Sequence, residues 1–249
     1  QHPESTIEFM KGYDWLQEPT AEYLNLGPGY TRESLKNFVY PSKEPLPEGL
    51  KYVAEYITWC LNAPEYLKFL QTQVEQLSLR LDIPLEFSRL TLTSLKDAKK
   101  WFPKTNVLFN ATGTGLSYSG GYDPLSVPIR GQTVLLNVPN PKTIRYANAT
   151  ITHQGKDDLI IPRESDTQAL LARARKLFPD LMFPDKTFDV VRTNVGFRPA
   201  RTGGSRVELE TCPDLKIVHA YGFGGMGYEV SVGAAKHAIE LYRFRPSKL

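Results

Sequence analysis

Hydrophobic residues recur with a helical period in three parts of the chain. The clearest is 64–81, where a proline stands near the start and leucine or valine returns at steps of three and four residues. The same spacing predicts helices over 165–178, which Ser165 would cap, and over 233–241. Ser94 is placed to cap a shorter helix that reaches Ala98. Each long helix should bury one apolar face.

Other apolar runs are too short for a helix and end at glycine, proline or asparagine, which predicts strands. The run at 106–109 resembles a buried strand and leads into a glycine turn at 110–113. The run at 216–221 leads into a second glycine turn. Further strands are expected at 6–9, 51–61, 85–87, 90–92, 129–138, 146–152 and 159–161.

The second glycine turn carries the strongest candidate chemistry. Gly222, Gly224, Gly225 and Gly227 stand between a predicted strand and a predicted helix. Glycine lets backbone N–H groups approach a ligand closely, and a helix N-terminus favours negative charge. With Arg198 at the end of the preceding apolar run, this pattern indicates an anion or cofactor cradle beside a carboxylate-binding arginine. The alternative is a plain tight turn and a surface ion pair.

Composition narrows the class of protein. The chain has 249 residues, enough for one large domain or two small ones, and 41% of them are hydrophobic, as in proteins with a buried core. The net charge of +3 comes without a basic run, which argues against nucleic-acid and membrane-surface partners. No apolar stretch has the length of a membrane span. Cys60 and Cys212 lie far apart, so we expect free thiols and no metal motif.

Two blocks near the C-terminus resemble the signature of a known family. Residues 194–208 contain NVGFRPAR, then GG and RVE, and residues 218–228 read VHAYGFGGMGY. Both are similar to the D-amino-acid oxidase family, the FAD enzymes that include D-aspartate oxidase, and the resemblance is greatest to its fungal branch. Further blocks match in the same order, so the resemblance covers most of the chain; they are 11–13, 56–67, 109–113, 128–134 and 160–163.

The resemblance implies an α/β fold with a partial FAD-binding Rossmann-like domain and a mixed-sheet α+β substrate domain. The FAD-binding part is expected at 62–137 and 205–249, and the substrate domain at 1–61 and 138–204. The family opens on a βαβ unit with a G-x-G-x-x-G turn for the FAD pyrophosphate. That unit is missing from this sequence, so we expect a fragment or a truncated product.

The implied activity is the oxidation of D-amino acids by FAD and O₂ to 2-oxo acids, ammonia and hydrogen peroxide. Arg198 matches the residue that binds the substrate carboxylate, and Gly225 the residue whose backbone carbonyl accepts from the amino group. Arg130 is assigned a structural role, and the four histidines are expected to be structural. The residues matching the FAD contacts of the family are Leu92, Thr112, Gly113, Gly224, Met226, Gly227, Tyr228 and Glu229.

Three departures from the family leave alternatives open. Leu159 stands where the family has a substrate-binding tyrosine, Glu229 replaces a neutral residue, and a strand that carries pocket residues is missing after Arg163. A non-catalytic relative and a glycine-oxidase-like amine oxidase are therefore the competing interpretations. The choice between neutral and acidic D-amino acids is also open, since it depends on the missing strand.

The last three residues suggest a location. Ser247-Lys248-Leu249 is the peroxisomal import address, which a receptor reads, and peroxide release suits that organelle. We therefore expect a peroxisomal enzyme with a D-amino acid and O₂ as substrates. A homodimer is compatible with the resemblance.

Overall fold

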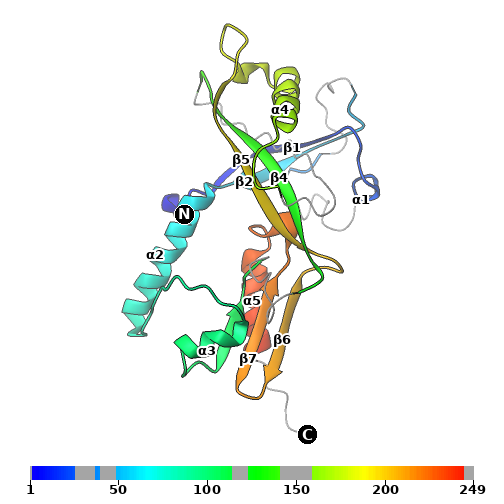
Figure 1. Ribbon diagram of the computed structural model, residues 1–249. Coiled ribbons are helices and arrows are strands. Elements are labelled where there is room, and N and C mark those ends of the chain that lie inside the picture. The colour runs from blue at the N-terminus through cyan, green and yellow to red at the C-terminus, as the bar shows by residue number, and fades with distance from the viewer. Residues whose placement is uncertain (1, 26–36, 40–48, 114–122, 141–158, 244–249) are drawn as a thin grey trace. The chain divides into compact units, whose positions relative to one another are not determined.

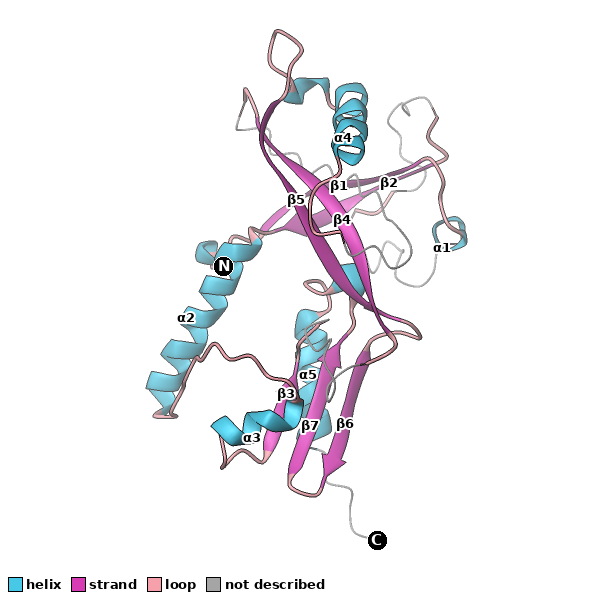
Figure 2. Cartoon of the chain, in the orientation of Figure 1, coloured by secondary structure: helices cyan, strands magenta, loops and turns pink. Residues whose placement is uncertain are grey.

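The chain forms two compact units that divide between Arg89 and Leu90. Figures 1 and 2 draw the helices and strands of both. The computed structural model describes residues 2–25, 37–39, 49–113, 123–140 and 159–243. Both units mix helices and strands, as the α/β prediction requires. The predicted assignment of segments to a FAD-binding part and a substrate domain stays a prediction. None of the described helices is both long and apolar enough to cross a membrane.

The first unit is built on an antiparallel pair of strands. Strand β1 (Glu8–Leu16) pairs along its whole length with β2 (Tyr52–Cys60), from Glu8 opposite Cys60 to Leu16 opposite Tyr52. Phe38 packs with Tyr52 and Ala54 to form the core of this unit. Two short helices, η1 (Pro3–Ser5) and α1 (Ala21–Leu24), complete its described part.

Helix α2 (Ala63–Leu81) confirms the predicted helix and ends at Asp82, which adopts a left-handed conformation. The strands predicted at 85–87 and 90–92 are wrong. The chain from Ile83 to Leu92 has no regular structure, and residues 83–91 are exposed. A short apolar run that buries neither face has nothing to hold it in a sheet. The apolar stripe of α2 is itself about half exposed among the described residues; it comprises Leu67, Leu70, Val74, Leu77 and Leu81.

The second unit contains a three-stranded sheet in the order β3-β7-β6. Strand β3 (Val107–Asn110) runs parallel to β7 (Leu215–Tyr221), and β6 (Arg206–Cys212) runs antiparallel to β7. Helix α5 (Ser231–Arg243) packs on β6 and β7, and its Tyr242 contacts Phe109 edge to face. The predicted helix at 233–241 and the strands at 106–109 and 216–221 are thus confirmed.

Another element supports the apolar end of this sheet. Helix η2 (Leu95–Asp97) places Leu95 against Leu215 and Ile217, and α3 (Ala98–Trp101) follows it directly. The Ser94 side chain accepts a hydrogen bond from the backbone N–H of Lys96, as the predicted cap requires. The sheet is therefore anchored at the amino end of β7 by apolar packing.

The second unit also contains a two-stranded ribbon (Figure 2). Strands β4 (Ser126–Asn137) and β5 (Asp189–Arg201) pair antiparallel, with a bulge between Leu135 and Leu136. Helix α4 (Glu164–Leu177) contacts β4, and η3 (Pro179–Leu181) follows it.

Two details around α4 correct the predictions. The cap predicted at Ser165 is wrong, because the helix begins at Glu164 with Arg163 as its N-cap and no side-chain cap bond. The strand predicted at 159–161 is also wrong, because the carbonyls of Leu159 and Ile161 accept hydrogen bonds from the Arg130 side chain instead of a neighbouring strand. The strand predicted at 146–152 lies outside the described residues.

Candidate active site

Two glycine turns meet at one edge of the three-stranded sheet. Because β3 and β7 are parallel, their carboxyl ends lie together, with Asn110 opposite His219. Strand β3 continues into Ala111-Thr112-Gly113, and β7 continues into the turn from Gly222 to Gly227. The carboxyl ends of parallel strands are where open α/β sheets bind ligands.

The last residues of β5 pass directly over both turns. Ala200 forms a backbone bridge with Phe223, and Pro199 approaches Gly113 so closely that a methyl group there would lie 3.4 Å from its ring. A methyl group at Gly222, whose φ is +83°, would lie 2.8 Å from the Cβ of Arg201. Only glycine combines that left-handed conformation with so close a neighbour.

Arg198 lies half-buried beside Gly225. A methyl group at Gly225 would lie 3.6 Å from Cδ of Arg198 and 3.8 Å from its Nε. The structure thus brings together the two residues that the sequence predicts to contact the substrate.

Gly131 makes room for the Arg198 side chain on the paired strand. A methyl group at Gly131 would lie 2.7 Å from a terminal guanidinium nitrogen of Arg198. Gly196, which pairs with Gly131 across the ribbon, has no such neighbour within 4 Å. Gly131 was not predicted as a site residue, because its contact depends on how β4 and β5 align.

The predicted flavin segment forms the second turn and leads toward α5. Gly224 to Met226 form a short 3-10 helix, η4, and a turn through Gly227, Tyr228 and Glu229 leads into α5. Residues 225–229 are all exposed, and no atom lies within 4 Å of a methyl group placed at Gly227. Open backbone at a helix N-terminus can accept a flat, partly negative ring system such as a flavin, so these residues fit the group.

Thr112 and Gly113 lie on the first turn at the same sheet edge, so they also fit a cofactor placed there. Leu92 lies in the irregular segment before η2, and none of the described contacts joins it to the glycine turns. The structure therefore brings seven of the eight predicted FAD residues to one edge.

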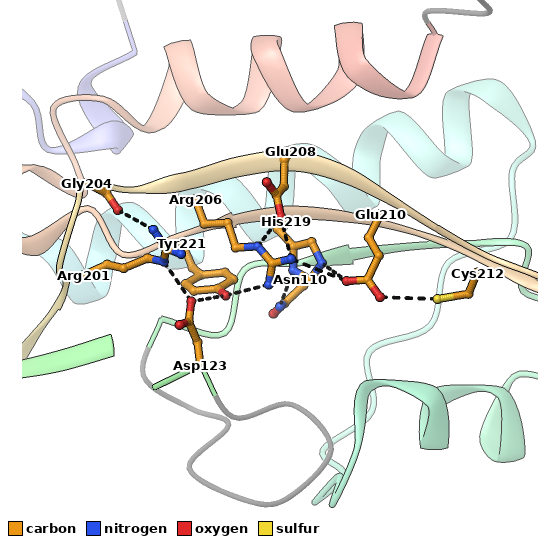
Figure 3. A network of polar contacts seen from close by, with 10 residues as sticks. All are labelled: Asn110, Asp123, Arg201, Gly204, Arg206, Glu208, Glu210, Cys212, His219 and Tyr221. Atoms are coloured by element: carbon orange, nitrogen blue, oxygen red, sulfur yellow. Dashed lines mark hydrogen bonds and ion pairs between the residues drawn. The ribbon is translucent and has the colours of Figure 1, made fainter. Parts of the chain in front are cut away.

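A series of hydrogen bonds through the buried side chains of Asn110 and His219 supports the first turn (Figure 3). The Asn110 amide nitrogen lies 3.1 Å from Nδ1 of His219, whose Nε2 lies 2.9 Å from the carboxylate of Glu210. The Asn110 oxygen accepts from the backbone N–H and the hydroxyl of Thr112, at 3.3 and 2.7 Å. Burial lowers the pKa of His219, while the hydrogen bond to Glu210 acts in the opposite direction.

A second set of hydrogen bonds, centred on Asp123, holds the end of β5 (Figure 3). Asp123 accepts hydrogen bonds from Nε of Arg201 at 2.8 Å and from the hydroxyl of Tyr221 at 2.7 Å. Burial acts to raise the pKa of Asp123, but the bonds from Arg201 and Tyr221 outweigh it and hold the pKa at about 2. Arg206 donates to the other side of the Tyr221 hydroxyl. These contacts keep β5 aligned over the glycine turns.

Arg130 lies on the opposite face of the ribbon and is completely buried. Its guanidinium donates to the carbonyls of Leu159 and Ile161, to Gln132 and to the carboxylate of Asp166. Its bonds go to backbone and buried side chains that link β4 to α4, which confirms its predicted structural role. Among the described residues, no group of three or more His, Cys, Asp or Glu side chains could hold a metal ion.

The sequence predicted Arg198 and Gly225 as binding residues, but it did not predict the residues that support the glycine turns. Asn110 ends β3 and lies opposite His219 on the parallel strand β7, so pairing of the two predicted strands would have indicated their contact. Asp123 gave no local signal, because it lies 78 and 98 positions from its partners Arg201 and Tyr221.

The sequence is similar to known proteins of one kind. The family model "FAD dependent oxidoreductase" (DAO) matches residues 43–241. A D-amino-acid oxidase of Schizosaccharomyces pombe is 30% identical over 268 positions, which cover 96% of this chain and 73% of that protein. A D-aspartate oxidase of Talaromyces thermophilus is 33% identical over 96% of this chain and 68% of its own length. A D-amino-acid oxidase of Fusarium vanettenii is 28% identical over 81% of this chain and 62% of that relative. The chain therefore belongs to the DAO family of FAD-dependent oxidoreductases, and its cofactor is FAD.

Proposed function

We propose that the chain acts in the oxidative deamination of D-amino acids. The observation that carries the proposal is the position of Arg198 beside Gly225, at the sheet edge where the two glycine turns meet. Relatives named D-amino-acid oxidase and D-aspartate oxidase support the same kind of reaction.

Arg198 and Gly225 bind different groups of the substrate. The planar guanidinium of Arg198 offers two parallel N–H donors, which match the two oxygens of an α-carboxylate. The backbone carbonyl of Gly225 accepts a hydrogen bond from the substrate amino group. Two of the substituents on Cα are then fixed, so the direction of the Cα–H bond selects the D-enantiomer.

When bound, FAD would supply the redox chemistry, which is hydride acceptance from Cα and electron transfer to O₂ with formation of hydrogen peroxide. The chain's residues bind and orient the substrate. His219 is not available as a base, because both of its ring nitrogens are engaged, one by Asn110 and the other by Glu210. No protein base is needed if the substrate amine enters neutral, and the imino acid product then hydrolyses with water to a 2-oxo acid and ammonia.

The test is the visible absorption of the purified chain mixed with FAD, followed by D-alanine or D-aspartate without oxygen. A bound-flavin spectrum that bleaches with a D-amino acid and not with L-alanine supports the proposal, and the more effective substrate identifies the class. A bound flavin that no D-amino acid bleaches contradicts it.

The second candidate is a non-catalytic family member that binds flavin. Glu229, in the turn before α5, has an exposed carboxylate where the family has a neutral residue. A carboxylate beside the flavin repels the negative charge of the reduced form and so disfavours reduction of the flavin. Bleaching that appears only in the Glu229→Gln variant would favour this candidate over an active oxidase.

We also propose that the protein is imported into peroxisomes through Ser247, Lys248 and Leu249, which lie outside the described residues. The proposal is supported by the sequence address alone. A fluorescent protein fused to the amino end should accumulate in peroxisomes. Deletion of Leu249 should leave it outside them, and an unchanged distribution after deletion contradicts the proposal.

A further inference from the structure

The buried side chain of Asn110 has one possible orientation. It is 4% exposed, and its amide oxygen must face Thr112, because the Thr112 backbone N–H can only donate. The amide nitrogen therefore faces β7 and donates to Nδ1 of His219.

The orientation of Asn110 determines the protonation state of His219. The amide nitrogen has no acceptor capacity, so Nδ1 must be unprotonated. The ring proton then lies on Nε2, which donates to Glu210 at 2.9 Å. His219 itself is only 1% exposed, so its ring is largely shielded from water. The chain from Thr112 to Glu210 is complete only with a neutral imidazole.

We propose that His219 is a positioning residue for the first glycine turn and holds Thr112 and Gly113 in place for FAD only while its ring is neutral. Protonation would set an N–H on Nδ1 against the N–H₂ of Asn110, two donors 3.1 Å apart. The Asn110 amide must then rotate or withdraw, and its oxygen leaves Thr112. The proposal rests on the predicted role of Thr112 and Gly113 in FAD binding.

The charges around His219 set the pH at which this occurs. On β6 it faces the carboxylates of Glu208 and Glu210 and the guanidinium of Arg206, on β7 the ring of Tyr221, and on β3 the neutral Asn110. Burial lowers the pKa of His219 from its ordinary value of 6.5, and the bond to Glu210 opposes this. A group with a lowered pKa stays neutral down to that pKa, so the turn should loosen only as the pH falls through the lowered pKa of His219.

The main experiment measures the dissociation constant of FAD by flavin fluorescence between pH 8 and pH 5. Wild-type affinity should fall with decreasing pH, approaching about tenfold per pH unit once His219 titrates, as one linked proton requires. His219→Asn keeps an acceptor near Nδ1 and cannot be protonated, so its FAD affinity should not change with pH. His237→Asn, at an exposed site on α5, is the matched control and should retain the wild-type pH dependence.

The Asn110→Asp variant should reverse the pH dependence of FAD affinity. A carboxylate accepts from the Thr112 N–H and from a protonated Nδ1, so FAD affinity should rise as pH falls. A wild-type affinity that stays constant while the pH passes through the pKa of His219, or a pH dependence that survives in His219→Asn, would overturn the proposal.

A second measurement is independent of FAD. Nitrogen-15 NMR of the imidazole should show the Nε2–H tautomer at pH 8, and the amide signals of Thr112 and Gly113 should shift with the same pKa as His219. If the chain binds no FAD at any pH, the proposed function fails while these shifts still test the positioning role. Amide signals that ignore the titration of His219 contradict the role of His219 itself.

Discussion

The two faces of the β4–β5 ribbon use arginine in opposite ways. Arg130 on β4 lies opposite Phe197, and the neighbouring Ile129 lies opposite Arg198. Because successive strand residues point to opposite faces, the two arginines are directed to different sides of the same ribbon. One side is packed under α4 and the other meets the glycine turns.

On the side of the ribbon under α4, the packed face, the arginine has no N–H donors left for a ligand. The side at the glycine turns is the open face. Arg130 is fully buried, and its donors go to Asp166, Gln132 and two backbone carbonyls. Arg198 is half-buried and lies among glycines, which leave space beside its guanidinium. The degree of burial therefore separates a structural arginine from a binding one, where residue type alone does not.

The largest expected effect is on the packed face. Arg130→Met should lower the free energy of unfolding by about 3–5 kcal/mol, because it leaves the buried Asp166 carboxylate without its ion pair. Urea unfolding followed by circular dichroism measures the change. Arg198→Leu on the open face is the control and should change stability by less than about 1 kcal/mol. Equal losses in the two variants would mean that the faces do not differ as described.

A smaller effect is expected from Gly131→Ala on the open face. The added methyl group displaces the end of a flexible side chain, so stability should hardly change, but the Arg198 guanidinium must move. A displacement of about 1 Å should reduce kcat/KM for a D-amino acid by about 10- to 100-fold, mainly through KM.

Gly196→Ala, on the partner strand directly opposite, is the matched control. No atom lies within 4 Å of its added methyl group, so kcat/KM should stay at the wild-type value. Steady-state oxygen consumption by the FAD-loaded variants measures both. Similar losses in the two would indicate a general effect on the ribbon and remove the role of Gly131.

The smallest effect concerns the acid side of the pH range. The pKa of Asp123 is about 2 in the folded chain, against an ordinary 3.8, so its stabilisation is complete above pH 3.8 and is lost as pH falls toward 2. Asp123→Asn should cost about 1–2 kcal/mol at neutral pH and should flatten the dependence between pH 4 and pH 2.

Thermal unfolding at a series of pH values measures this dependence. Asp214→Asn, at an exposed aspartate in the β6–β7 turn, should leave the acid profile unchanged. An Asp123→Asn variant with the wild-type acid profile would show that the bonds from Arg201 and Tyr221 do not hold the end of β5.

The sequence predicted correctly those helices and strands whose own residues show a clear hydrophobic or glycine pattern. Helix α2 and helix α5 follow from apolar periodicity, and the strand, glycine turn and helix around Gly225 follow from composition. The strands predicted at 85–87, 90–92 and 159–161 failed, because a strand needs a partner that a short apolar run does not specify. In the last case, Arg130 takes the backbone carbonyls that a partner strand would have used.

The site was predictable where a motif carried it and not where it depended on register. Arg198 and Gly225 were identified from the family signature, and the structure brings them together. The space that Gly131 leaves for Arg198 exists only because β4 and β5 pair with Gly131 opposite Gly196. Nothing near Gly131 in the sequence specifies that pairing.

The central claim is that the open face of the ribbon holds the substrate through Arg198. The most direct measurement is the anaerobic reduction of FAD-loaded wild type and FAD-loaded Arg198→Leu by D-alanine and D-aspartate, followed by loss of flavin absorbance. Both proteins should bind FAD equally, and the variant should be reduced at least about 100-fold more slowly at equal substrate concentration. A variant reduced at the wild-type rate, with the same dependence on substrate concentration, would contradict the account.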